Sequence, residues 1–346
     1  MNQDILNKIS QAYNFSELTY VGSPEEEISS LNAFVKTKEG VDLFIKNYKK
    51  GHAEKRDISE IVEHFISQDN SIPVVLPYKN KDGKCHVIIE DEMYSVFPHI
   101  INKHNHPGSD AERTILTKSL GTMLGKIHAV SRKFPIPKTI TPISWVNKST
   151  VESIDELKKI KEVIILKDIF EDYNQRALSL VELKISLLKE SNFHVKENEP
   201  MVVCHGDYHK ANILFDNNKN IIGVCDWDLG GIGNPYSEFV RSFNMCVIRR
   251  DFDNLPSKKD FTKSFVDGYV NACGFEFDQA ELSYAIESWY QKTISTTWPL
   301  SDHYYRSDTR ADSLLDSELN KILFLRDNRQ SIFEHIKSCL KNSILS

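Results

Sequence analysis

The sequence predicts an α+β protein of two lobes, in which an antiparallel-sheet lobe comes first and a mainly helical lobe follows. Short stretches of alternating apolar and polar residues, separated by turn residues, are concentrated before residue 99. Longer segments with helical periodicity dominate after residue 110. A chain of 346 residues is long enough for two lobes that share a cleft. We therefore expect an N-terminal lobe at residues 1–98, a hinge at about 97–101 and a C-terminal lobe at residues 99–346.

The N-terminal lobe is expected to contain two helices, at residues 2–15 and 53–69, because apolar residues recur there at helical spacing. Asn80–Gly83 has the composition of a hairpin turn. Strands are predicted, in chain order, at residues 31–35, 41–48, 74–78, 85–90 and 92–101.

The C-terminal lobe is expected to begin with a strongly periodic helix at residues 110–131. Gly121 and Gly125 are four residues apart in this helix and would permit the close packing of a second helix. Two charged amphipathic helices are predicted at Val151–Tyr173 and Gln175–Glu190, and the chain is again mostly helical after residue 235.

The composition excludes several classes of protein. A formal net charge of −6 argues against a nucleic-acid binder, which normally has a basic face, and slightly favours a cationic substrate. The first thirty residues lack the pattern of a signal peptide, and no apolar run approaches the ~18 residues of a membrane span, so we expect a cytoplasmic protein without a membrane partner. The six cysteines are scattered without a C-x-x-C pair, which is typical of reduced, buried thiols.

The most informative stretch of the sequence is residues 202–228. Two apolar, strand-like runs flank a polar loop within residues 204–215, and a further apolar strand at 221–228 ends in Asp226 and Asp228. Such polar groups at strand ends usually serve chemistry, because they are costly to bury without partners. An Asp, an Asn five residues later and an Asp at the end of the next strand suit phosphoryl transfer.

In that chemistry Asp207 would accept the proton of the substrate hydroxyl, and the oxygen atoms of Asn212 and Asp226 would bind Mg²⁺ on the nucleotide phosphates. His205 and the glycine that follows it would shape the loop, with the imidazole hydrogen-bonded to the loop or to the Asp226 turn. Asp228 could contact the metal or the substrate, or could be structural.

A zinc site is an alternative interpretation of the same loop, with Cys204, His205, Asp207 and His209 as ligands. Neighbouring side chains on an extended segment point in opposite directions, and the sequence offers no second cluster to complete the site. We therefore prefer the phosphoryl-transfer interpretation.

Three features upstream fit a nucleotide-binding lobe. Lys46 lies on a predicted strand, where kinases carry a lysine that contacts phosphate, although a lone lysine is also compatible with a surface role. Among the acidic residues of the 53–69 helix we choose Glu60 as the partner of Lys46; a solvated charged face is the alternative. The backbone around Phe97, His99 and Ile100, in the hinge, would contact the adenine edge.

The segments HGDYHKANILF and IIGVCDWD resemble the catalytic loop and the metal-binding strand of the aminoglycoside phosphotransferase and choline kinase-like family of small-molecule kinases. The order of lysine strand, glutamate helix, hinge, catalytic loop and metal strand is also similar. The resemblance implies a bilobal, protein-kinase-like fold and the use of ATP or GTP with Mg²⁺. It implies Asp207 as the base, Asn212 and Asp226 as magnesium ligands, and Lys46 as the contact to the α- and β-phosphates.

The sequence departs from the family pattern at two places. A G-x-G-x-x-G loop is absent, since only Gly22 precedes the acidic run at residues 25–27. Glu238 stands where relatives usually have an aspartate after the Gly-Asx-Pro turn. The H-R-D, D-F-G and A-P-E motifs of protein kinases are also missing, so a protein substrate is not expected.

We therefore expect a kinase that acts on a hydroxyl of a small molecule. The acceptor could be an aminoglycoside antibiotic, an amino sugar, a sugar, or an amino alcohol such as homoserine or choline. The partners would be this acceptor and the nucleotide, and the chain would be a monomer or a homodimer. The alternative is a non-catalytic binding, coat or scaffold protein with the same fold, which would have no physical need for Lys46, Asp207, Asn212 and Asp226 together.

Overall fold

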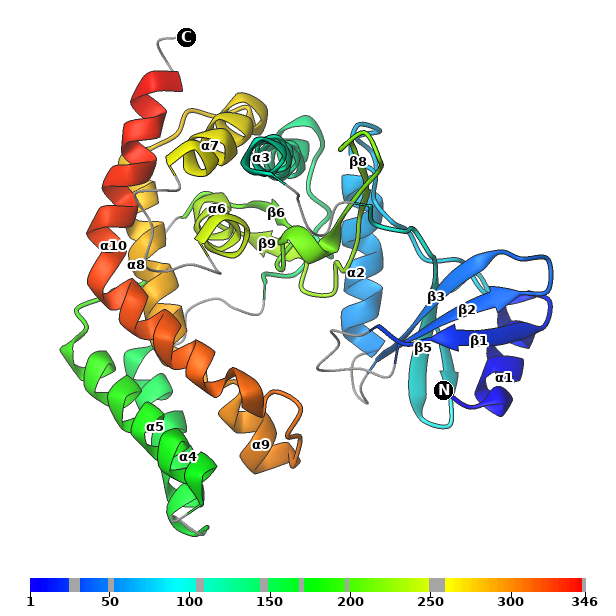
Figure 1. The fold of residues 1–346 in the computed structure, drawn as a ribbon, viewed down its shortest axis with the longest axis horizontal. Helices are drawn as coiled ribbons and strands as arrows, with labels where there is room; N and C mark the ends of the chain where they lie inside the picture. Colours follow the sequence, from blue (N-terminus) through cyan, green and yellow to red (C-terminus); the bar gives the residue numbers. More distant parts are fainter. Residues whose placement is uncertain are drawn as a thin grey trace.

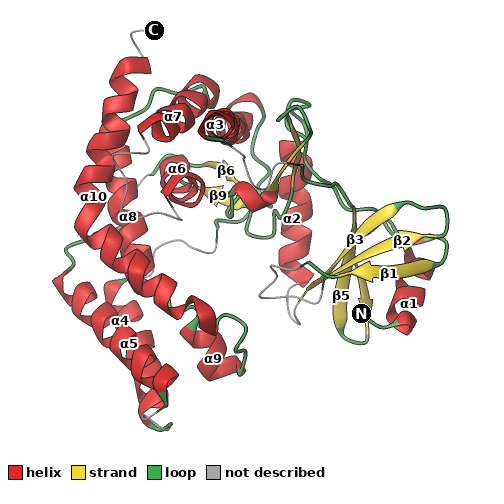
Figure 2. Ribbon diagram, viewed as in Figure 1, coloured by secondary structure: helices red, strands yellow, loops and turns green. Residues whose placement is uncertain are grey.

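A computed structural model describes residues 1–24, 32–48, 53–103, 109–143, 149–167, 171–196, 199–248 and 259–343. Figure 1 shows an N-terminal sheet on one side and a larger, mainly helical part on the other. The predicted α+β class, with an antiparallel sheet first and helices after it, is confirmed (Figure 2). No helix among the described residues combines the length and the apolar composition needed to cross a membrane.

The N-terminal part is built on a five-stranded sheet in the order β1-β2-β3-β5-β4, in which neighbouring strands are antiparallel. Its elements are α1 (Gln3–Tyr13), β1 (Leu18–Gly22), β2 (Ala33–Thr37), β3 (Asp42–Tyr48), α2 (Ala53–Ile66), β4 (Val87–Ile89) and β5 (Glu92–Pro98). Leu6 and Ile9 of α1 pack with Val35, Leu43 and Ile45 of the sheet in a small separate core. Burial of this one apolar face holds α1 on the sheet.

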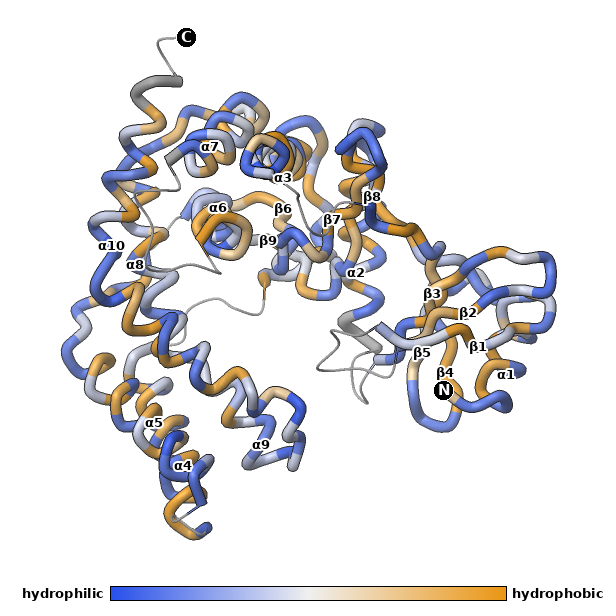
Figure 3. Tube along the Cα trace, in the orientation of Figure 1, coloured by the Kyte–Doolittle hydropathy of each residue, from blue (hydrophilic) through white to orange (hydrophobic). Residues whose placement is uncertain are grey.

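The remaining elements form the larger part. They are α3 (Asp110–Lys133), α4 (Thr150–Ile165), α5 (Asp172–Glu190), β6 (Val202–Cys204), the 3₁₀ turn η1 (Lys210–Asn212), β7 (Ile213–Phe215), β8 (Ile221–Val224), β9 (Gly231–Gly233), α6 (Pro235–Phe243), the π-helical turn η2 (Asn244–Ile248), α7 (Lys259–Cys273), α8 (Gln279–Ser295), α9 (Leu300–Arg306), the 3₁₀ turn η4 (Asp312–Leu314) and α10 (Leu315–Ser343). The strands form two antiparallel two-stranded sheets, β6 with β9 and the hairpin of β7 with β8. In Figure 3 the tube of α10 alternates between hydrophobic and hydrophilic segments, as expected of an amphipathic helix.

The helix α2 lies between the sheet and the helical part (Figure 1). Its buried residues Val62, Phe65 and Ile66 belong to the large core of the helical part, together with Trp227, and not to the small core under the sheet. The side chains of α2 are therefore fixed relative to the β7–β8 hairpin and the loops beside it.

Two predicted elements differ from the structure, and two strands of the structure were not predicted. The segment 74–78 is not a strand of the N-terminal sheet, because Val75 N–H donates to the carbonyl of Val224 at 3.0 Å and thereby joins the segment to β8. The predicted helix Val151–Tyr173 ends as α4 at Ile165, and α5 begins at Asp172. The strands β1 and β9 were not predicted, because a five-residue and a three-residue strand carry too little alternation to be recognised.

The close helix packing predicted from Gly121 and Gly125 is confirmed for α3 and α7. A Cβ atom on Gly121 would lie 2.1 Å from the carbonyl oxygen of Phe265, and one on Gly125 would lie 2.6 Å from that of Tyr269. On the α7 side, a Cβ on Gly268 would lie 2.3 Å from the carbonyl oxygen of Lys118. The two backbones approach so closely that no side chain fits between them at these positions.

Gly121→Ala should therefore destabilise the protein even though alanine favours helices. We expect the free energy of unfolding to fall by about 1–3 kcal/mol, since the new methyl group meets rigid backbone. The exposed position in Lys118→Ala is the matched control in the same helix, with a change within about 0.5 kcal/mol. Urea unfolding of the three proteins measures both values, and equal stability of Gly121→Ala and wild type would contradict the packing described here.

Candidate active site

The loop between β6 and β7 carries most of the predicted site residues. It leaves the buried strand β6 through His205 and Gly206, and Gly206 has a φ of +82°. A Cβ atom there would lie 1.9 Å from the carbonyl oxygen of Leu229, so both the backbone angle and the space require glycine. The predicted role of this glycine in shaping the loop is confirmed.

His205 connects the loop to the end of the β7–β8 hairpin through hydrogen bonds. Its buried imidazole donates from Nε2 to the carbonyl of Cys225 at 3.0 Å and accepts the N–H of Asp207 at Nδ1, at 3.2 Å. Burial lowers the pKa of His205, which favours the neutral ring that this pair of hydrogen bonds requires. The predicted hydrogen bonds, to the loop and to the Asp226 turn, are both present.

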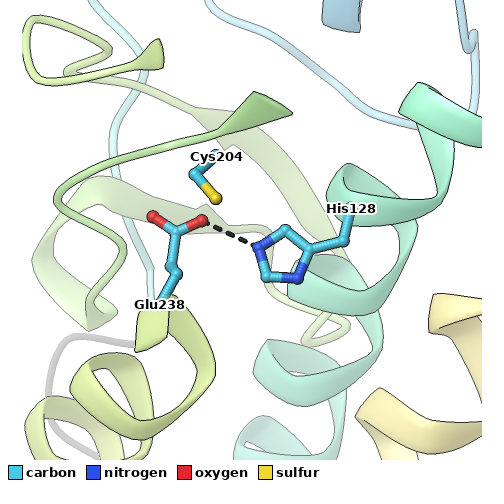
Figure 4. Close-up of side chains that lie close together, drawn as sticks. All are labelled: His128, Cys204 and Glu238. Atoms are coloured by element: carbon cyan, nitrogen blue, oxygen red, sulfur yellow. Dashed lines mark hydrogen bonds and ion pairs between the residues drawn. The ribbon is translucent and has the colours of Figure 1, made fainter. Parts of the chain in front are cut away.

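Glu238, near the start of α6, holds the same loop in place through hydrogen bonds to its backbone. Its carboxylate accepts the backbone N–H of His205 at 3.0 Å and that of Gly206, and it accepts Nε2–H of His128 at 2.8 Å. Figure 4 shows Cys204 beside this pair. Burial alone would raise the pKa of Glu238, but His128 and the backbone donors together lower it, so the buried carboxylate stays ionised.

Cys204, His128 and Glu238 are also the group of side chains that could hold a metal ion within the described residues. This is not the predicted alternative of Cys204, His205, Asp207 and His209. The second ring nitrogen of His128 accepts the hydroxyl of Tyr269 at 2.7 Å, so His128 and Glu238 are saturated by protein hydrogen bonds. The cluster is a structural support of the loop.

Asp207 projects from the loop into a strongly cationic environment. Arg241 of α6 donates from Nη2 to one carboxylate oxygen of Asp207, and His209 Nε2 lies 3.6 Å from the other. Burial alone would raise the pKa of Asp207, but His209 and Arg241 together bring it well below its usual range. The carboxylate is thus ionised and can accept a proton.

Asn212 and Asp226 lie at the same end of the β7–β8 hairpin, since Ile213 pairs with Val224 and Cys225 N–H donates to the carbonyl of Asn212 at 3.0 Å. The amide nitrogen of Asn212 donates to the carbonyl of Asp207 at 3.0 Å, which leaves the amide oxygen to face other groups. Asp226 has a φ of +64°, a conformation that aspartate tolerates better than most residues. An amide oxygen and a carboxylate from the same end of a hairpin are a donor set that fits Mg²⁺.

Lys46 of β3 reaches this hairpin from the N-terminal sheet. Its Nζ lies 2.8 Å from Oδ1 of Asp226 and 2.7 Å from Oδ2 of Asp228. Burial alone would lower the pKa of Lys46, but the two carboxylates together raise it well above the usual value. The structure therefore brings Lys46 to the predicted metal-binding carboxylate, and Asp228 shares the same cation.

The predicted ion pair between Lys46 and Glu60 is absent. Glu60 lies on a side of α2 that faces Lys79, with 3.5 Å between the charged atoms. The acidic residue of α2 that is buried near the site is Glu63, and it binds Arg56 of the same helix with 2.9 Å between Nη1 and Oε1. Arg56 and Glu63 are seven residues apart, so they share one face of α2 and satisfy each other.

The hinge residues lie at the end of β5. Phe97 is buried, and the guanidinium carbon of Arg56 lies 5.7 Å from the centroid of its ring. The backbone N–H of His99 donates to the carbonyl of Asp42 at 3.2 Å. Ile100 follows and is half-buried. Asn102 then hydrogen-bonds to the backbone of both Ile213 and Phe215 of β7, which connects this segment to the β7–β8 hairpin. The acidic run at residues 25–27, where a phosphate loop would lie, is outside the described residues.

Sequence reasoning missed two arginines of the site. Arg241 follows Glu238 by three residues, so it is presented one helical turn further along α6 and reaches Asp207. Arg56 Nη1 lies 3.8 Å from Asp228. The three-residue spacing of Glu238 and Arg241 could have indicated that Arg241 lies near the loop. The contact of Arg56 could not be predicted in this way, because it depends on where α2 packs.

Comparisons with known proteins show a family and a shared fold. Residues 23–282 match the model of the phosphotransferase enzyme family (APH). An amicoumacin kinase, solved with AMP-PNP, Ca²⁺ and Ami, is 14% identical with a TM-score of 0.61, covering 95% of this chain and 93% of that chain. A spectinomycin phosphotransferase, solved with ADP and its antibiotic, is 16% identical with a TM-score of 0.56, covering 94% of each chain. A microcompartment-associated aminopropanol kinase is 12% identical with a TM-score of 0.53, covering 93% of this chain and 98% of that chain. At these identities the structural likeness shows the fold.

Glu238→Gln should loosen the loop that carries Asp207. In the wild-type protein the carboxylate accepts hydrogen bonds from His128 and from two backbone N–H groups. The NH₂ group of glutamine would face one or more of these donors, so we expect the free energy of unfolding to fall by about 2–4 kcal/mol. The matched control is Glu287→Gln, which removes an exposed ion pair with Arg329 and should cost less than about 1 kcal/mol. Urea unfolding compares the two variants, and a Glu238→Gln protein as stable as its control would show that the anchor is dispensable.

Proposed function

The chain belongs to the phosphotransferase enzyme family, and from that membership we propose that it transfers the γ-phosphoryl group of ATP or GTP to a hydroxyl of a small molecule. The acceptor oxygen forms a new bond to the γ-phosphorus, and the bond between that phosphorus and the β,γ-bridging oxygen breaks. The proton of the hydroxyl passes to Asp207, and the nucleoside diphosphate leaves. Bound Mg²⁺ would neutralise charge on the phosphate oxygens.

One observation supports this proposal above the others. Lys46 comes from the N-terminal sheet and meets Asp226 at the end of the β7–β8 hairpin, and Asn212, at the start of this hairpin, is hydrogen-bonded to the backbone of Asp207. Little covalent chemistry is needed for phosphoryl transfer, so the positions of a base, a cation and metal-binding oxygens account for most of the catalysis.

Each group has a defined task in this proposal. Asp207, held in place by Arg241 and by the hydrogen bond of its own N–H to His205, orients the acceptor hydroxyl. Lys46 contacts the α- and β-phosphates, and Asn212 and Asp226 hold Mg²⁺. The hinge around Phe97, His99 and Ile100 contacts the adenine edge; because His99 N–H is already donated to Asp42, we expect the backbone of Ile100 to provide the donor.

Asp207→Asn tests the base. The amide is nearly the same size but cannot take the proton, so kcat should fall by roughly 10²–10⁴-fold while nucleotide affinity changes little. Coupled ADP release measures kcat, and calorimetry with AMP-PNP measures affinity. Asp82→Asn, at an exposed turn position, is the matched control and should keep full activity. Undiminished turnover in Asp207→Asn would remove Asp207 from the mechanism.

Asp226→Ala tests the metal site. Loss of this carboxylate should raise the Mg²⁺ concentration required for half-maximal activity by on the order of tenfold or more, because a hard cation loses an anionic oxygen ligand. Asn212→Ala should act in the same direction with a smaller effect, since the amide is neutral. An unchanged Mg²⁺ dependence in both variants would contradict the assignment.

The same assays separate the enzyme from a non-catalytic protein of the same fold. A scaffold would bind AMP-PNP without consuming ATP in the presence of any hydroxylated acceptor. Mg²⁺-dependent ADP release that rises with acceptor concentration and disappears in Asp207→Asn would exclude the scaffold.

A further inference from the structure

A second cationic region lies on the helical side of Asp207, away from Lys46. Arg241 of α6 and Lys292 of α8 both face the ring of Trp289, with Arg241 Cζ at 6.0 Å and Lys292 Nζ at 5.5 Å from its centroid. Trp289 itself is buried. Two cations from different helices therefore meet over one aromatic ring, immediately beside the proposed catalytic carboxylate.

Arg241 is only partly used by the contacts of the described residues. Its Nη2 binds Asp207, whereas its Nη1 is buried and has no hydrogen-bond acceptor in the described part of the chain. A buried donor without an acceptor costs about 1–3 kcal/mol, and more for a charged group, so such a donor beside a reactive carboxylate indicates a place for a ligand oxygen.

The charges around Lys292 also indicate a place for an anionic ligand. Among the described residues, the charged groups that shift the pKa of Lys292 include two cations, Arg241 and Lys321, and the carboxylate of Asp207. Burial and the two cations lower the pKa of Lys292 to about 6. An anion placed between Arg241 and Lys292 would relieve this repulsion and would favour the protonated amine.

The position of the region assigns that anion to the acceptor and not to the nucleotide. The nucleotide phosphates are expected on the other side of Asp207, where Lys46 meets Asp226 and Asp228. The helix α8 packs against α5, α6 and α10, and Figure 1 shows it on the far side of α6 from α2 and the N-terminal sheet.

We propose that the acceptor is a small hydroxy acid, whose carboxylate binds Arg241 and Lys292 while its hydroxyl faces Asp207. This inference rests on the proposed kinase function and narrows its substrate class. It runs against the preference for a cationic acceptor that the overall net charge of −6 suggests, because the local charge beside the base has the opposite sign. Arginine suits this role, since its planar donors match a carboxylate.

Matched acceptors test the proposal on the wild-type protein. Homoserine is compared with 3-aminopropan-1-ol, and glycerate with glycerol, so that each pair differs by the carboxylate. We expect kcat/KM for the acid to exceed that for its partner by about 10- to 100-fold, the value of a charge-assisted hydrogen bond. Phosphate-bearing alcohols such as glycerol 3-phosphate are tested as well. A higher kcat/KM for these alcohols than for the hydroxy acids would show that the bound anion is a phosphate and would overturn the proposed class.

A variant locates the contact. Lys292→Gln should raise KM for the acid by about tenfold with a smaller change in kcat, and should leave KM for the neutral partner nearly unchanged. Lys189→Gln, at an exposed position of α5, is the matched control with unchanged constants for both. If Lys292 were only structural, its substitution would change KM for both acceptors equally, and that result would overturn the assignment.

The outcomes also separate this inference from the kinase proposal. Turnover with 3-aminopropan-1-ol or glycerol that equals or exceeds turnover with homoserine or glycerate would overturn the hydroxy-acid class and leave the kinase standing. Absence of turnover with every alcohol, together with no effect of Asp207→Asn on nucleotide consumption, would overturn both.

Discussion

The site depends on one buried carboxylate, that of Glu238. An ionised carboxylate is costly to bury unless its oxygens are saturated, and here His128 and two consecutive backbone N–H groups of the catalytic loop saturate them. Because Glu238 belongs to α6 and His128 to α3, the loop is fixed to two helices of the large core.

A second constraint joins the sheet to the helical part. Lys46 on β3 is held by Asp226 and Asp228, and Arg56 and Glu63 lie on the face of α2 that approaches Asp228. The ammonium between the two carboxylates offsets their mutual repulsion, so the lysine supplies positive charge at the place where Mg²⁺ is proposed to bind. Nucleotide and metal would have to replace these contacts as they enter.

Much of this arrangement could be predicted from local sequence. The alternation of residues 42–48 and the polar loop after Cys204 predicted the strand of Lys46 and the catalytic loop, because strand period and glycine geometry are local properties. The partner of Lys46 could not be predicted in this way. Glu60 and Glu63 have similar sequence surroundings, and only the packing of α2 decides that Glu63 is buried with Arg56 and that Glu60 faces Lys79. The meeting of Arg241 and Lys292 over Trp289 likewise depends on how α6 packs against α8, a long-range contact that periodicity does not encode.

In the proposed reaction a phosphoryl group moves from a nucleotide to a hydroxyl oxygen beside Asp207. Phosphorus NMR of wild-type protein with ATP, Mg²⁺ and a hydroxylated acceptor observes that transfer directly. We expect a new phosphomonoester resonance that grows in step with ADP. ADP accompanied only by inorganic phosphate, or no ADP at all across the acceptors, would contradict the proposed reaction.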